Sequence, residues 1–330
     1  MNTSDIRFYK PQSTLGGRMS ATEAPSGVKN AVWPDASADE RAAGSVAYRK
    51  SFLKVASTSG TPLQNTRLFI ETPTPGDDRV CLFPGTQTDV VADLTGAERL
   101  YSGGWLHADA ASGAASITVL AEHGADHIFR DGDLIRISNQ ATVGADGSQE
   151  YLRLAATDAV SWNGDVATLT FDAGITLANA YAASDTRVAP VIEVGTIATS
   201  VDTCGKVSAA GDYANGDPTT LIAVDAIGGI EQRWTITFSS PSAFTCVGDN
   251  VGAVGGGSVG GTFAPNNPAF SRPYFTLPSA GWSGTWVSGD VLTFSTHPAA
   301  VAIWQQRVIP AGCGTRAANT IHIGVAGQAT

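Results

Sequence analysis

Short runs of alternating apolar and polar residues, separated by turn residues, dominate this 330-residue chain. Alternation over about four to eight residues predicts half-buried β-strands, and the glycine, proline and aspartate between the runs predict turns. We therefore expect an all-β protein. The predicted strands cover residues 48–55, 67–71, 79–83, 116–120, 133–138, 150–154, 166–171, 187–194, 232–238, 243–247, 273–277, 291–295 and 301–309.

The N-terminal segment has a different pattern. Residues 1–34 contain glycine and proline at irregular intervals and show no sustained period, which predicts an extended arm rather than a folded element. Ser37 and Glu40 then have the spacing of a capping box, and Gly44 follows two alanines, so we predict one short helix. Residues 1–44 are thus expected to be an arm with a short helix.

The remaining strands divide into two or three β-sandwich or barrel-like modules, as the length of the chain also suggests. Residues 45–104 are expected to form a small sandwich, residues 105–195 a barrel-like module and residues 221–330 a C-terminal sandwich. Residues 196–220 are rich in glycine, aspartate, alanine and threonine, and we predict that they form a linker.

Composition and charge narrow the classes of function. Charged residues make up only 15% of the chain, which suits strands and turns better than solvent-facing helices. The formal net charge of -10 argues against a nucleic-acid partner, because phosphates are bound by clustered Lys and Arg. Residues 1–54 nevertheless carry eight Lys or Arg against five Asp or Glu. Either this unevenness is chance, or the basic segment docks on an acidic neighbour.

If the arm docks on a neighbouring subunit, its aromatic side chains anchor it and its charges mainly steer the encounter. An arm without its own core orders only on such a surface. The predicted interface residues are Arg7, Phe8, Tyr9, Lys10, Arg18, Lys29 and Trp33.

Targeting and cysteine usage point to a chain made in a cytoplasm. No apolar run approaches the length of a membrane-spanning helix, about eighteen residues, and the first ten residues lack signal-peptide character. We therefore expect no membrane insertion.

The four cysteines are widely spaced, which favours buried thiols over a zinc site. If a disulfide forms, Cys204 and Cys246 are the expected pair, because both fall in or next to the last group of strands.

The sequence motifs that could indicate a catalytic or metal site lack the neighbouring secondary structure that such sites require. Gly255–Gly260 fits dinucleotide-binding and hydrolase patterns, but it lies in a glycine-rich loop followed by proline and asparagine rather than by a helix. His123 and His127 have metal-ligand spacing, but Gly124 interrupts the helix that the spacing requires. We expect a non-enzymatic protein with no catalytic residues, no cofactor and no metal site.

Several segments spread over most of the chain resemble one protein family. They are Gly16-Gly17-Arg18-Met19-Ser20, Trp33-Pro34-Asp35, residues 40–44, Tyr48-Arg49-Lys50, Leu68-Phe69-Ile70, Phe83-Pro84-Gly85-Thr86-Gln87, residues 96–101, residues 263–268 and Thr296-His297-Pro298-Ala299-Ala300. The family comprises uncharacterised structural proteins of tailed phages and Mu-like prophages, and it supplies no catalytic residues.

This resemblance implies a structural subunit of a tailed-phage virion, in the tail, baseplate or neck. Its partners would be copies of itself and other phage structural proteins. A capsid-decorating or host-binding surface protein is the alternative. A virion glycan hydrolase is a third reading, although no fixed sequence period indicates the β-helix usual in such enzymes.

Overall fold

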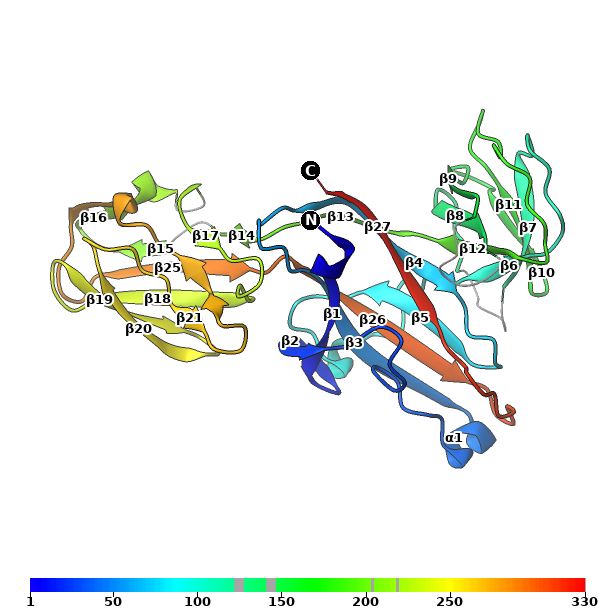
Figure 1. The fold of residues 1–330 in the computed structure, drawn as a ribbon, viewed down its shortest axis with the longest axis horizontal. Helices are drawn as coiled ribbons and strands as arrows, with labels where there is room; N and C mark the ends of the chain where they lie inside the picture. The colour runs from blue at the N-terminus through cyan, green and yellow to red at the C-terminus, as the bar shows by residue number, and fades with distance from the viewer. Residues whose placement is uncertain (122–127, 141–146, 203–204, 218–219, 330) are drawn as a thin grey trace.

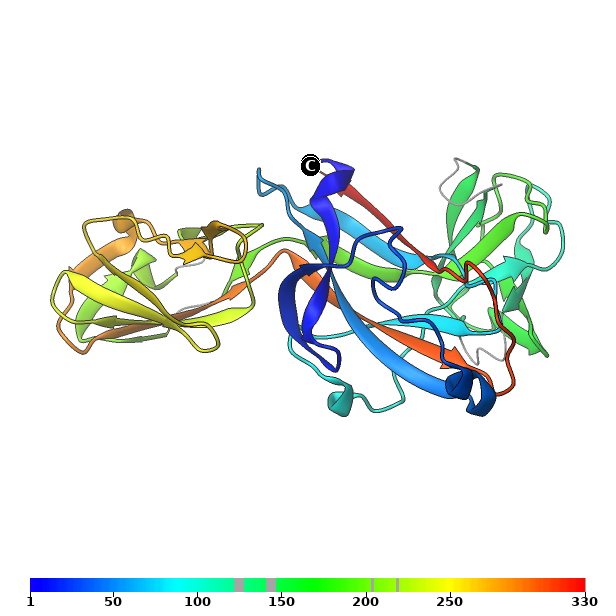
Figure 2. The ribbon, with the colours of Figure 1, turned by 60° about the horizontal axis from the view of Figure 1, so that its bottom comes forward.

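The structure is a computed structural model that describes residues 1–121, 128–140, 147–202, 205–217 and 220–329. It is nearly all β, as the sequence pattern predicts, with one short α-helix in the described part of the chain. Three domains lie in a row, with a central domain between two others (Figures 1 and 2). The outer two are insertions in the chain of the central domain, the first inserted domain (104–190) and the second inserted domain (200–297).

The central domain is a sandwich of two antiparallel sheets, ordered β2-β1-β3-β26-β5 and β13-β4-β27. Leu53, Leu68 and Ile303 belong to the core that the two sheets share. Its strands are β1 (Ile6–Ser13), β2 (Gly16–Glu23), β3 (Ser45–Val55), β4 (Leu63–Thr72), β5 (Arg79–Pro84), β13 (Ile192–Ile197), β26 (Ala300–Ile309) and β27 (His322–Ala329).

Strand β26 joins the two ends of the chain. It pairs with β3 from Ser45↔Ile309 to Lys54↔Ala300, and with β5 on its other side. Residues 45–104 therefore form a sandwich only together with the C-terminal strands, which corrects the boundaries expected at 45–104 and 221–330. The physical reason is that strands so far apart in sequence leave no trace of their pairing in a local pattern.

The N-terminal segment is folded, which corrects the prediction of an extended arm. Strands β1 and β2 form a hairpin, here called the N-terminal hairpin, and β1 also pairs with β3 from Ile6↔Val55 to Tyr9↔Phe52. Gly16 and Gly17 at its turn have φ values of +104° and +88°, which favour glycine. The predicted helix is confirmed as α1 (Ala38–Ala43), with Ser37 and Glu40 forming the capping box.

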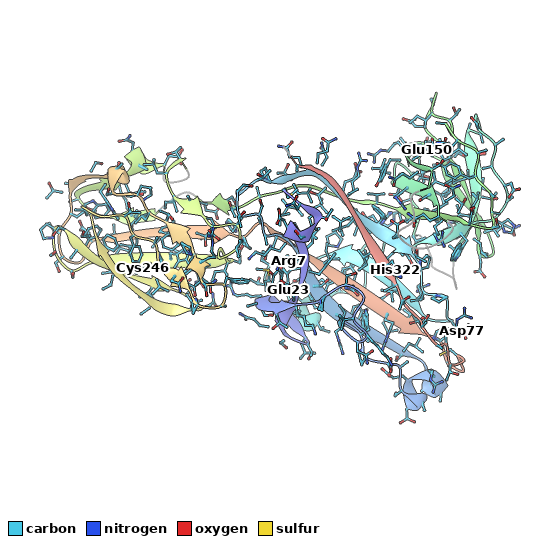
Figure 3. The ribbon with its side chains drawn as sticks, in the orientation of Figure 1. Arg7, Glu23, Asp77, Glu150, Cys246 and His322 are labelled. Carbon is cyan, nitrogen blue, oxygen red and sulfur yellow. The ribbon has the colours of Figure 1, made fainter. Side chains whose placement is uncertain are left out.

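The first inserted domain is a single seven-stranded sheet in the order β10-β11-β7-β6-β12-β8-β9. An isolated bridge between Leu154 and Phe171 draws the β9 side towards β11, so the sheet curls around its core. Glu150, labelled in Figure 3, accepts hydrogen bonds from Ala178 N, Asn179 N and Tyr181 Oη and so fixes the loop before β12. The strands are β6 (Gly104–Leu106), β7 (Ser116–Ala121), β8 (Leu134–Asn139), β9 (Gln149–Arg153), β10 (Val160–Asn163), β11 (Val166–Thr170) and β12 (Thr186–Pro190).

The second inserted domain packs a larger sheet, β14-β25-β18-β19-β20 with β15 also on β25, against short strand pairs across an aromatic core. Trp234, Phe238 and Trp286 lie in that core, so most of the C-terminal aromatic residues are core residues as expected. The strands are β14 (Ser200–Val201), β15 (Gly205–Val207), β16 (Ala210–Tyr213), β17 (Ala223–Val224), β18 (Gln232–Phe238), β19 (Ala243–Gly248), β20 (Gly252–Ser258), β21 (Asn266–Asn267), β22 (Arg272–Pro273), β23 (Phe275–Thr276), β24 (Trp282–Thr285) and β25 (Val291–His297).

Two sequence predictions in this region need correction. The expected linker at 196–220 contains the end of β13 and strands β14, β15 and β16, which pair with β4, β25 and β24. The expected glycine-rich loop contains β20, which pairs with β19 over its full length. In both segments the residues are small, so the alternation of apolar and polar side chains that predicts a strand is missing. The fold leaves little room for larger side chains, since a Cβ on Gly256 would lie 2.4 Å from Phe244 O.

Candidate functional site

The candidate site is the joint between the central domain and the second inserted domain. The chain crosses there twice, between β13 and β14 and between β25 and β26. Side chains of the N-terminal hairpin and β3 face residues 225–231 and Phe270 across it. We call this group of contacts the interdomain joint.

Lys54 is the central residue of the interdomain joint. It belongs to β3, is 0% exposed, and donates a hydrogen bond from Nζ to Ile227 O, 2.5 Å away. Its ammonium also lies 4.3 Å from the centre of the Phe270 ring, a cation–π contact. Burial lowers the pKa of Lys54 to about 8, against a smaller opposing effect of Asp225. Lys54 therefore links the two domains, and this link depends on whether its side-chain amine is protonated.

Two residues of the N-terminal hairpin complete the contact. Tyr9 is 3% exposed and its ring meets Phe270 edge-on, with 6.0 Å between the ring centres. Arg18 donates from Nη1 to Glu231 O over 2.6 Å. The hairpin therefore contacts both β3 and the second inserted domain. Tyr9 and Arg18, predicted to bind a neighbouring subunit, make these contacts within their own chain.

His297 lies at the chain crossing itself, as the last residue of β25. Its Nδ1 is 2.8 Å from Glu231 Oε2 and its Nε2 is 3.1 Å from Asp202 Oδ2. Burial disfavours the charged imidazole, but the hydrogen bonds and charges of the two carboxylates outweigh it and raise the pKa of His297. Glu231 thus takes part twice, through its carboxylate to His297 and through its carbonyl oxygen to Arg18.

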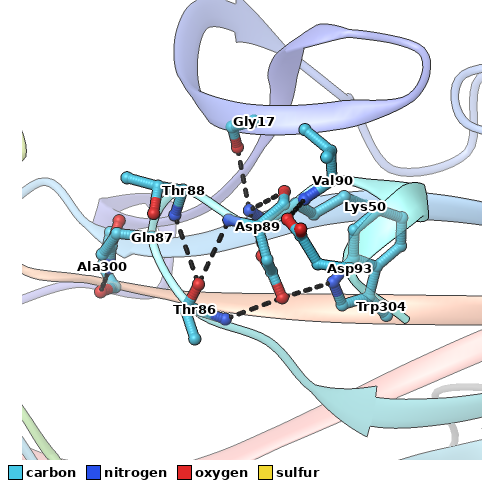
Figure 4. Close-up of polar contacts among 10 residues, drawn as sticks. All are labelled: Gly17, Lys50, Thr86, Gln87, Thr88, Asp89, Val90, Asp93, Ala300 and Trp304. Atoms are coloured by element: carbon cyan, nitrogen blue, oxygen red, sulfur yellow. Dashed lines mark hydrogen bonds and ion pairs between the residues drawn. The ribbon is translucent and has the colours of Figure 1, made fainter. Parts of the chain in front are cut away.

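A second buried lysine fixes the tip of the N-terminal hairpin (Figure 4). Lys50 Nζ donates to Gly17 O over 2.8 Å and lies 2.5 Å from Asp89 Oδ1. Asp89 Oδ2 in turn accepts a hydrogen bond from Trp304 Nε1 over 2.9 Å. Burial opposes the charge of Asp89, but the bonds from Lys50 and Trp304 hold its pKa below the ordinary value. This Lys50 cluster holds the hairpin in the position that the interdomain joint needs.

The other predicted interface residues are also engaged within the chain. Arg7 pairs with Glu23 across the hairpin at 2.6 Å (Figure 3), and Phe8 packs on the central core. Lys10 is half-buried, and its carbonyl oxygen accepts a hydrogen bond from Ser20.

Two residues predicted on the arm follow the hairpin. Lys29 forms an exposed pair with Asp35 at 2.7 Å. The guanidinium groups of Arg49 and Arg307 both lie over the Trp33 ring, 5.3 Å and 4.7 Å from its centroid. The segment that carries Trp33 is therefore fastened to the face of the five-stranded sheet.

The cysteine and histidine predictions are settled only in part. Cys246 is a free thiol in the core of the second inserted domain, and burial raises its pKa to about 12. Its predicted partner Cys204 lies outside the described residues, as do His123 and His127. Within the ranges that the structure describes, no group of three or more His, Cys, Asp or Glu residues is arranged to hold a metal ion.

Sequence reasoning missed Lys54 and His297 of the interdomain joint, and Lys50 and Asp89 of the Lys50 cluster. Lys54 did carry a signal, because it interrupts the apolar end of the predicted strand at residues 48–55, between Leu53 and Val55. Charged residues in such positions are fully buried only when they are paired. The identity of their partners depends on tertiary structure and had no local signal.

The comparisons with known proteins give no family. No protein-family model and no curated protein matches the chain. Among solved structures, the "Crystal structure of infectious bursal disease virus VP2 subviral particle" aligns with 86% of this chain and 79% of that chain, at 9% identity and a TM-score of 0.09. A TM-score this low carries no argument about fold or function. Within the described residues, no helix has the length and apolar character needed to cross a membrane.

Proposed function

We propose that this chain is a structural subunit of a tailed-phage virion, in the tail, the baseplate or the neck. The observation that carries the proposal is the row of three β domains (Figure 1). The middle domain holds the second inserted domain through the hydrogen bonds of Lys54 and Arg18. A subunit of this shape contacts neighbours at both ends at once, as repeated subunits of rings and tubes do.

The position of the segments that resemble phage structural proteins supports the proposal. Residues 16–20 contain Gly17 and Arg18, residues 48–50 contain Lys50, and residues 296–300 contain His297, all of which hold the N-terminal hairpin or the interdomain joint. Gln87, in another of these segments, donates to Ala300 O over 2.7 Å. The resemblance thus falls on the residues that set the arrangement of the domains.

The experiment is to delete the gene from a phage or inducible prophage that carries it and to examine the particles. We expect tailless or incomplete particles, and we expect a tagged copy to label the tail, baseplate or neck in averaged electron images. Normal, infectious particles after the deletion, without the tagged protein in purified virions, would overturn the proposal.

A capsid-decorating or host-binding surface protein is the second candidate. It is favoured by the second inserted domain, which projects from the rest of the molecule and exposes Val207 and Val247 on the outer face of its large sheet. In that case the deletion leaves tails intact, and the label appears on the head or at the tip. Turnover of polysaccharide or peptidoglycan by the pure protein, abolished by one Asp or Glu substitution, would instead support the hydrolase reading.

A further inference from the structure

We propose that the outer edge of β20 is a strand-pairing site for β20 of a second copy of this chain. The two strands would run antiparallel about a twofold axis and join two second inserted domains into one continuous sheet. This inference names a partner surface for the proposed function, and its meaning in a virion rests on that function.

Strand β20 lies at the end of its sheet. It pairs with β19, and no described strand pairs with its other side. Five of its seven residues, all except Val254 and Gly257, are exposed. The free side of such a strand presents a row of unpaired N–H and C=O groups, which is a template for pairing with another chain.

The edge carries no charged residue and no proline, the usual protection of an exposed strand. Glycine at 255–257 is explained by the fold itself, through the positive φ of Gly255 and the closeness of Phe244 to Gly256 and Gly257. Ala253 and Ser258 are exposed positions without such a requirement, and neither carries a charge. Charges or proline occur on several other edge strands, whereas β10 and β27 also carry neither. The protected edges have Arg18 and Glu23 on β2, Pro84 on β5, Glu150 and Arg153 on β9, and Glu193 on β13.

One protective device is present, a bulge at Val254. The register with β19 shifts there, from Val247↔Ala253 to Cys246↔Gly255. A bulge twists an edge locally and hinders long strand addition. It leaves the segments Gly252–Ala253 and Gly256–Ser258 regular on either side, so we expect short pairing of these segments rather than open-ended growth of the sheet.

One exposed apolar side chain borders this edge on the outer face of the sheet. Val247 is 43% exposed and lies directly opposite Ala253 in the β19–β20 ladder. Strand pairing across the edge would bring Val247 of a second copy alongside and remove part of both side chains from water, which favours association.

Charge and symmetry point to a copy of the same chain as the occupant. The chain has a net charge of -10, so copies repel each other over most of their surface. The edge strand carries no formal charge, and the acidic residue closest to it in sequence is Asp249, in the preceding turn. An antiparallel self-pairing centred on Gly255 places Gly252 opposite Ser258, with no bulky or charged pair in contact. Such an interface is self-complementary, as a twofold dimer requires.

The test is the oligomeric state of the purified full-length chain by analytical ultracentrifugation, with amide hydrogen exchange as a second readout. We expect a concentration-dependent dimer and slower exchange of the amides of residues 252–258 at high concentration. The double variant Ala253→Lys/Ser258→Lys should weaken the self-association at least about tenfold, since it places like charges along the edge, and should abolish the extra protection.

The matched control is Ser161→Lys/Thr170→Lys, which adds the same charge at exposed positions of the first inserted domain and should dimerise like the unchanged chain. If the edge variant has a lowered melting temperature, the single variant Ser258→Lys replaces it. A monomer at every concentration, or a dimer that the edge variant leaves intact, overturns the pairing. Either result leaves the proposed function standing, because that is tested on particles; a β20 dimer that never enters virions overturns the proposed function alone.

Discussion

Lys54 in the central domain donates a hydrogen bond to Ile227 O in the second inserted domain, with 2.5 Å between Nζ and the oxygen. The ammonium has left water entirely, and aromatic rings of Tyr9 and Phe270 lie around it. A buried cation costs free energy unless hydrogen bonds and charges compensate it. The interdomain joint therefore depends on pH, and its residues can be tested singly.

Replacing Lys54 with methionine should change how stability depends on pH. Below pH about 8 the lysine is charged in the folded and unfolded states, and the folded state bears the cost of the buried charge. Between pH about 8 and 10.5 the unfolded state binds more protons, so the free energy of unfolding of the unchanged chain should rise relative to Lys54→Met. At about 1.4 kcal/mol per pKa unit, the relative gain is about 3 kcal/mol.

Urea unfolding at about pH 7 and at higher pH values about half a unit apart measures this difference. The control is Lys10→Met, which removes a lysine of the N-terminal hairpin that lies outside the interdomain joint. Parallel pH profiles for Lys54→Met and the unchanged chain would show that Lys54 is not buried as described.

His297 should act in the opposite sense. Its pKa is raised in the folded state, so its contribution is fully present below the ordinary value of 6.5 and is lost as the pH rises through the folded value. The variant His297→Gln should therefore destabilise the chain more at low pH than at high pH, by roughly 1 kcal/mol for a partly exposed pair. Imidazole NMR titration reports the pKa directly, and the signal that His297→Gln removes is assigned to His297 among those of the five histidines. A His297 pKa below its ordinary value would contradict this description.

The Lys50 cluster predicts a strong effect of removing one partner. Asp89→Ala leaves Lys50 buried without its carboxylate and should cost about 3 kcal/mol or more. Adding Lys50→Met to that variant should restore part of the loss, because the uncompensated charge is then gone. Thermal unfolding of the two single variants and the double variant completes the cycle. Strictly additive losses would mean that the two residues do not interact.

Deleting residues 2–30 should prevent folding of the central domain. The deletion removes β1 and β2, exposes the edge of β3 and takes away Tyr9, Arg18 and the Gly17 carbonyl oxygen bound by Lys50. We expect an insoluble or partly unfolded product by circular dichroism. Lys29→Ala is the mild control, since its ion pair is exposed and contributes little. A soluble truncated chain with a near-normal melting temperature would restore the prediction of a free arm.

The cysteines should react in the order of their exposure. Cys246 is buried with a pKa of about 12, and Cys81 is buried with a raised pKa, whereas Cys313 is half-exposed. Mass spectrometry after brief alkylation of the native chain should find Cys313 modified first and Cys246 only after denaturation. Peptide mapping without reductant checks the predicted disulfide. A disulfide-linked Cys204–Cys246 peptide would contradict the free Cys246 thiol.

Local sequence patterns predicted most of the strands. The alternation at residues 232–238 and 291–295 corresponds to β18 and β25, and the capping box at Ser37 and Glu40 begins α1. These features depend on side chains close in sequence, which is the information that a pattern contains.

The errors have a physical cause in each case. Pro11 made β1 look irregular, but it sits at a register shift of the hairpin, where a strand tolerates proline. The two glycines at the hairpin turn were themselves a hairpin signal that the arm prediction did not use. The interdomain joint could not be predicted from local sequence, since Lys54 and Ile227 are brought together only by the packing of two domains.

The two inserted domains interrupt the central domain in sequence, so the strands of the central domain are synthesised at widely separated times. Lys54 pairs with Ala300, 246 residues later, so β3 leaves the ribosome long before β26 exists. At about 5–20 residues per second, that wait is roughly 10–50 s, ample for both inserted domains to fold during translation. Until β26 arrives between β3 and β5, a nascent chain exposes the apolar end of β3. Ribosome stalling late in the message would therefore release a product with two finished domains and an aggregation-prone middle.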